Sequence, residues 1–155
     1  MGFEPKEPGI MRRKPRDKNE KILNAPELVF IIGIAITMTV IILLFFKETF
    51  QNLEYARTLV FTSLVVFEMM NVFNCKSEFR SVFRTNPFNN PLLLFSILFS
   101  ILLQLIVLYT PLSSFFKTVP LSLEDWTRII LAGFIIIFSG EILKMINNEL
   151  FLKHK

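Results

Sequence analysis

One carboxylate is the most informative chemical feature of this chain. Glu68 lies within the otherwise apolar run Thr58–Phe73. A charged side chain near the middle of a bilayer costs about 2.5–3.5 kcal/mol on insertion scales, so such residues usually face other helices, a cation or an ion path. Helical spacing places Asn71 and Cys75 on the same face as Glu68, and Leu64 extends that face. Glu68 and Asn71 therefore project two oxygen-bearing side chains in one direction.

These oxygens suit a hard cation such as Ca²⁺, which takes about six to eight oxygen ligands. Glu68, with a weaker contribution from Asn71, is our candidate cation and metal ligand, in a site that other helices must complete. Two alternatives remain open from the residues alone. Glu68 is then either a protonated, structural hydrogen-bonding group within a helix bundle or part of a proton relay.

The remaining polar residues of the apolar runs have simpler explanations. Glu141 and Lys144 are three residues apart, which predicts an ion pair within one helix near its end. Cys75 is the only cysteine, so it has no intrachain disulfide partner and we assign it to the membrane edge. His154 is one imidazole near the chain end. We expect no catalytic residue among them.

Several catalytic motifs are absent from the sequence. It contains no G-x-x-x-x-G-K-[ST] phosphate loop, no G-x-S-x-G elbow, no H-E-x-x-H and no CxxC. We therefore expect no cofactor bound by the chain alone and no enzymatic activity of its own.

Composition predicts an all-α membrane protein with four transmembrane helices in an antiparallel bundle. Hydrophobic residues make up 52% of the chain, and the mean hydropathy is +0.52. Four apolar spans stand out, at about residues 28–46, 58–74, 92–109 and 128–147, each near the ~20 residues that cross a bilayer. We divide the chain into a basic loop or tail (1–26), a transmembrane domain (27–150) and a short tail (151–155).

The basic residues predict the orientation. All but four of the 17 Lys and Arg residues lie before the first span, around the loop between the second and third spans, or near the C-terminal end. The positive-inside rule then places both termini in the cytosol of a multi-pass membrane protein in contact with lipids, with Gln51 and Ser114 outside. Because topology explains the basic charge, we expect no nucleic-acid partner.

Two helix starts can be located from capping residues. Asn90 is followed by Pro91, the pattern of an N-cap with proline at the first helical position. Ser122 is followed by Asp125 three residues later, as in a capping box, and Trp126 suits the membrane interface. The third helix is expected to begin at Asn90 and Pro91, and the fourth just after Ser122.

Three stretches carry a resemblance to a known family. They run from Ala56 through Glu68-Met-Met-Asn71 to Glu78, then Val119-Pro-Leu-Ser122-Leu-Glu-Asp-Trp126, then Gly140-Glu-Ile-Leu-Lys144. Together they resemble the C-terminal membrane region of P-type cation-transporting ATPases, closest to the calcium pumps. The opening Gly2–Pro5 and Ile10–Arg16 are similar to the cytosolic loop after the sixth membrane helix of those pumps. The four spans would then be helices seven to ten.

The resemblance implies a role for Glu68. In sarcoplasmic-reticulum-type calcium pumps the eighth helix contributes one acidic ligand, and Glu68 stands at the matching position. Some relatives carry Gln or Asp there. The aspartate phosphorylation motif, the nucleotide-binding domain and the ligands of helices five and six have no counterpart in the printed sequence, so we expect that this chain alone neither hydrolyses ATP nor pumps.

The resemblance is compatible with functional hypotheses of different classes. In the first, the chain is the C-terminal membrane part of a P-type pump for calcium or another cation and assembles with the N-terminal portion on a separate chain. In the second, it is a freestanding four-helix scaffold or regulatory protein without transport activity. A small ion channel is a weaker third reading, since one acidic residue makes no obvious selectivity filter.

Overall fold

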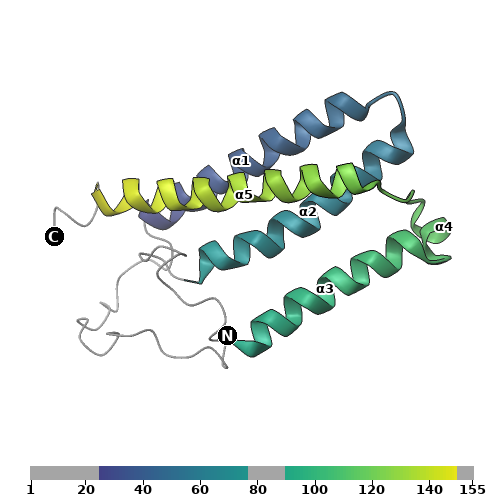
Figure 1. Ribbon diagram of the computed structural model, residues 1–155. Helices are drawn as coiled ribbons and strands as arrows, with labels where there is room; N and C mark the ends of the chain where they lie inside the picture. Colours follow the sequence, from purple (N-terminus) through teal and green to yellow (C-terminus); the bar gives the residue numbers. More distant parts are fainter. Residues whose placement is uncertain (1–24, 77–89, 150–155) are drawn as a thin grey trace.

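The computed structural model describes residues 25–76 and 90–149. In these two ranges the chain forms helices and no strand: α1 (Ala25–Thr49), α2 (Leu53–Cys75), α3 (Pro91–Tyr109), the short α4 (Leu112–Phe116) and α5 (Leu123–Asn147) (Figure 1). The four long helices are long and apolar enough to cross a membrane. The all-α fold with four candidate spans is therefore confirmed. Their antiparallel order across a membrane and the three-part division of the chain remain predictions.

The long helices are longer than the predicted apolar spans. Helices α2 and α5 begin at capping residues that precede those spans in the sequence. α2 begins at Leu53 because the side chain of Asn52 accepts a hydrogen bond from the Tyr55 amide at 3.2 Å. α5 begins at Leu123, where Ser122 and Asp125 form the expected capping box. The sequence did not predict α4. It is a single short turn of helix, and its C-cap Lys117 adopts a left-handed conformation (φ 52°).

The third helix begins where the sequence predicted. The side chain of Asn90 accepts from the Leu93 amide at 3.1 Å, and Pro91 occupies the start of α3. Proline is favoured there because the first helical amides have no acceptor within the helix. The local cap thus fixes the end of α3 that lies nearest α2's last turn.

Helices α1, α2 and α5 pack together and form most of the core. Their buried apolar residues share one cluster: Ile34, Met38 and Ile41 of α1, Leu59, Val66 and Phe67 of α2, and Ile129, Ala132 and Ile136 of α5. Two glycines allow α2 and α5 to approach. A Cβ added to Gly133 would lie 2.3 Å from the Met70 sulfur, and one added to Gly140 would lie 2.5 Å from Asn74 Cγ.

A polar network joins the first turns of α2 and α5. The Tyr55 hydroxyl donates a short hydrogen bond to the buried Asp125 carboxylate. Asp125 also accepts from the amide and hydroxyl of Ser122 at 2.8 and 2.7 Å. Nearby, the Val119 amide donates to Thr58 Oγ1 at 3.0 Å. These bonds fix the α4–α5 connection to α2.

Helix α3 stands apart from this three-helix core (Figure 1). Only Gln104 and Leu108 of α3 are buried. No residue from Pro91 to Leu103 is buried. Most of α3 therefore offers its surface to lipid or to further protein.

Candidate cation site on the open face of α2

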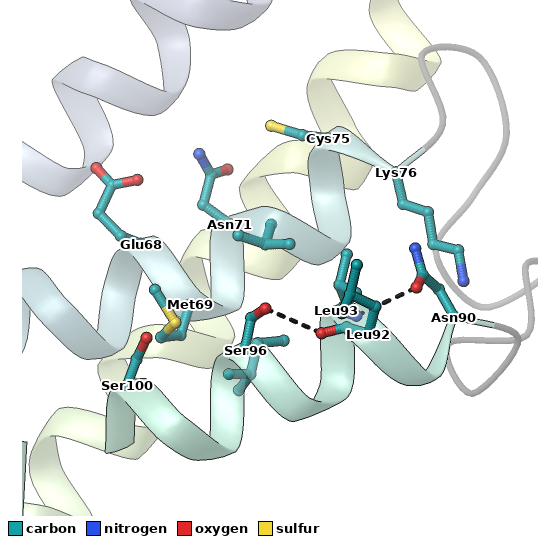
Figure 2. A pocket seen from close by; sticks show the side chains of 12 residues that line it. Glu68, Met69, Asn71, Cys75, Lys76, Asn90, Leu92, Leu93, Ser96 and Ser100 are labelled. Carbon is teal, nitrogen blue, oxygen red and sulfur yellow. Dashed lines mark hydrogen bonds between the residues drawn. The ribbon is translucent and has the colours of Figure 1, made fainter. Parts of the chain in front are cut away.

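Glu68, Asn71 and Cys75 form a row along α2. Figure 2 shows the three side chains pointing the same way, away from α3. Glu68 and Cys75 are exposed and Asn71 is partly buried, and Leu64 continues the exposed face. The predicted helical face therefore exists.

The opposite side of α2 packs into the core. Thr62, Ser63, Phe67 and Asn74 are all buried there. Among the residues that the structure describes, no hydrogen bond or ion pair is formed by the Glu68 carboxylate. The Glu68 carboxylate is therefore accessible from the exposed face of α2.

A cleft of about 450 Å³ lies beside this row, between the second half of α2 and the first half of α3. Glu68 and Asn71 border it from α2, while Ser96 and Ser100 border it from α3 (Figure 2). The Ser96 hydroxyl is engaged with the Leu92 carbonyl at 2.9 Å. The α3 wall thus adds few free oxygen atoms to those of the Glu68 and Asn71 side chains.

The described residues do not form a complete metal site. No group of three His, Cys, Asp or Glu side chains in residues 25–76 and 90–149 could hold a metal ion. Since Ca²⁺ requires about six to eight oxygens, a cation at Glu68 needs ligands from outside these helices. Glu68 and Asn71 as ligands remain predictions.

Asn74 links Asn71 to α5. Its Nδ2 donates to the Ile136 carbonyl at 3.1 Å and to Asn71 Oδ1 at 3.4 Å. Asn74 is only 1% exposed and lies against Gly140. The orientation of Asn71 therefore depends on the contact between α2 and α5. No role for Asn74 was predicted from the sequence, although its side-chain amide, three residues after Asn71 on a helix, was the available signal.

The predicted Glu141–Lys144 pair is present. Lys144 Nζ lies 3.6 Å from Glu141 Oε1. Lys144 is buried, with 3% of its surface exposed, so its ammonium group lies among protein atoms. Cys75 is a free thiol in the last turn of α2. His154 lies outside the described residues.

The comparison with known protein families decides the identity of this membrane unit. A family described as "Cation transporting ATPase, C-terminus" matches residues 1–146. The chain belongs to this family. The resemblance seen in the sequence is thereby confirmed, and the four apolar helices are those of an integral membrane protein from a P-type ATPase family.

Several relatives of this chain are named calcium-transporting ATPases. It is 37% identical over 137 residues to the calcium-transporting ATPase of Bacillus subtilis, covering 84% of this chain and 15% of that protein. It is 32% identical over 135 residues to calcium-transporting ATPase 1 of Yarrowia lipolytica, covering 84% of this chain and 14% of that protein. An endoplasmic reticulum-type calcium-transporting ATPase 2 of Arabidopsis thaliana is 41% identical over 90 residues, which are 57% of this chain and 8% of the relative. The chain thus spans a small part of the length of the relatives it matches.

Proposed function

We propose that this chain supplies the last four membrane helices of a calcium pump and that Glu68 provides one carboxylate to the transported-cation site. The observation that carries the proposal is the position of Glu68 on the face of α2 that the other described helices leave uncovered. A carboxylate facing hydrocarbon is costly. Helices of the rest of the pump, packed on this face, would cover it and supply the missing oxygens.

The proposal also assigns partners and limits. The partner is the N-terminal portion of a P-type ATPase, present as a separate chain or as a covalent continuation, and lipids surround the outer face of α3. Ca²⁺ is the transported ion and no resident cofactor is needed. ATP hydrolysis belongs to the partner portion, so this chain alone has no ATPase activity. Both termini lie in the cytosol, with the α1–α2 turn and α4 on the opposite side.

The test separates charge from shape at Glu68. Glu68→Gln keeps the size of the side chain and one oxygen but removes the negative charge. Loss of one charged contact of about 1.5–3 kcal/mol corresponds to a roughly 10- to 100-fold lower apparent affinity for Ca²⁺. The measurement is Ca²⁺-dependent transport by vesicles that contain this chain and the partner portion. Glu68→Ala should lower the affinity further.

The matched control is Glu54→Gln, which removes the same charge from the exposed first turn of the same helix. It should leave the affinity unchanged. The chain without its partner should release no phosphate from ATP. Equal affinity of wild type and Glu68→Gln in a transporting complex would reject the ligand role. If Glu68→Gln leaves the affinity unchanged and Glu68→Ala impairs assembly with the partner, the carboxyl group has a structural role. If no partner portion restores transport, the result favours a freestanding scaffold protein.

A further inference from the structure

Among residues 25–76 and 90–149, the buried contacts within helix α3 lie toward its C-terminal end. Its two buried residues, Gln104 and Leu108, are four residues apart and therefore lie on one face of the last turns. Leu108 belongs to the same hydrophobic cluster as the core residues of α1, α2 and α5. At the same end, the Tyr109 hydroxyl accepts from Trp126 Nε1 at 2.8 Å and donates to the Leu121 carbonyl at 2.9 Å.

The other end of α3 is flanked by hollows. The cleft beside Glu68 separates Leu92–Ser100 from α2 on one side. A second hollow of about 580 Å³, lined almost entirely by apolar side chains, runs along the middle of α3 from Ile97 through Ile101 to Leu105 and faces residues of α2 and α5. Among the described helices, the first half of α3 therefore has little packing that would fix its distance from α2.

One side-chain hydrogen bond joins α3 to α2 directly among the described residues. Gln104 Nε2 donates to Thr62 Oγ1 at 2.9 Å. Both side chains are buried, with Gln104 4% and Thr62 0% exposed. In an apolar surrounding, a buried amide that loses such a partner leaves its N–H groups unpaired, so the pair holds the two helices in one register.

We propose that Gln104 is a positioning residue whose bond to Thr62 is the pivot of α3 and sets the separation of α2 and α3 along the cleft beside Glu68. The bond lies between the packed end and the hollow end of α3. A helix held at one end transmits a small change at the pivot to its free end, because the helix itself is stiff. The link to cation binding rests on the proposed function, whereas the geometric role does not.

The chain offers a direct way to measure the cleft. Cys75 is the only natural cysteine and ends α2 on the rim of the cleft, while the exposed Leu92 lies on the opposite rim. Spin labels on Cys75 and on Leu92→Cys report the distance across the cleft in lipid nanodiscs. The wild-type chain should give one dominant distance.

Gln104→Leu and Thr62→Val each remove the hydrogen bond with little change in volume. In either variant, the ratio of the dominant distance to all other distances should fall by about 3- to 18-fold. This range corresponds to the strength of interhelical hydrogen bonds measured in membrane proteins. The double variant should resemble each single variant, because both remove the same interaction. Thr62→Ser keeps the hydroxyl and should restore the wild-type distribution.

Thr39→Val is the control, since Thr39 is exposed on α1 and its hydroxyl donates to the Ala35 carbonyl of its own helix at 2.7 Å. If Gln104→Leu fails to insert, Thr62→Val decides the question from the partner side. An unchanged distance distribution in the variants, or the same change in Thr39→Val, would overturn the pivot. The measurement uses no cation, so its outcome is independent of the transport test on Glu68.

Discussion

Substitution of Gly140 by alanine tests the contact that orients Asn71. A Cβ at position 140 would lie 2.5 Å from both Cγ and Nδ2 of Asn74 and 2.7 Å from its Oδ1. Ordinary contacts of this kind are near 3.5 Å, so Asn74 must move by about 1 Å. The bond from Asn74 Nδ2 to the Ile136 carbonyl, at 3.1 Å, is already near the long end of the normal range and would break.

The expected loss of stability follows from three terms. Overpacking of a tight contact costs about 1–3 kcal/mol. Loss of an interhelical hydrogen bond in a membrane protein adds about 0.6 kcal/mol, and up to about 1.7 kcal/mol. The better helix propensity of alanine returns about 1 kcal/mol. Gly140→Ala should therefore lower the free energy of unfolding by roughly 2 kcal/mol.

Gly33→Ala is the matched control. A Cβ there would also be close, at 2.6 and 2.8 Å from the two terminal methyl groups of Leu143, but these lie at the far end of a flexible side chain that can turn away. Its expected effect is near zero because the relaxed contact and the gain in helix propensity offset each other. The assay is equilibrium unfolding in mixed micelles, followed by the fluorescence of Trp126, the only tryptophan.

A double variant tells the mechanism apart from a general defect. Asn74→Ala removes the side chain that the new Cβ would meet, so Gly140→Ala should cost little in that background. Two results would refute the reasoning. One is equal stability of the Gly140→Ala and Gly33→Ala chains, and the other is a penalty at Gly140 that persists without the Asn74 side chain.

Two further predictions concern topology and capping. Gln51→Cys and Ser114→Cys, each in a Cys75→Ser background, should react with a membrane-impermeant thiol reagent applied outside intact cells. Both positions are exposed on the protein. Protection from the reagent would therefore mean that the chain has the opposite orientation. Ser122→Ala should lower the free energy of unfolding by about 1 kcal/mol through loss of the cap. Thr127→Ala, on the exposed side of the same helix, should lower it by less. Equal losses in the two variants would show that the capping box does not stabilise α5.

The features predicted correctly from the sequence are local. The caps at Asn90 and Ser122 depend on a side chain and an amide three residues away, so the order of residues suffices to find them. The shared face of Glu68, Asn71 and Cys75 follows from helical periodicity in the same way. The extra turn at the start of α2 was missed because hydropathy marks the apolar core of a span and not the polar first turn between the Asn52 cap and that core. At α5 the Ser122 cap had already located that turn.

The features that could not be predicted join residues far apart in the sequence. Gln104 and Thr62 are 42 positions apart, and Asn74 and Ile136 are 62 positions apart. Periodicity shows that each polar group shares a face with others, but it does not show which helix packs there. The packing of Asn74 against Gly140 needs a particular register of α2 and α5, which side-chain volumes set.

The fate of the polar side chains within the apolar helices supports the assignment of Glu68. In the sequence, Asn74 and Gln104 resemble Glu68 in that each is a polar residue within an apolar stretch. The structure buries both of them between described helices, where each donates a hydrogen bond. Glu68 instead remains exposed on α2. The two amides therefore hold this four-helix unit together, whereas the carboxylate faces outward, where a cation and the remaining helices of a pump would meet it.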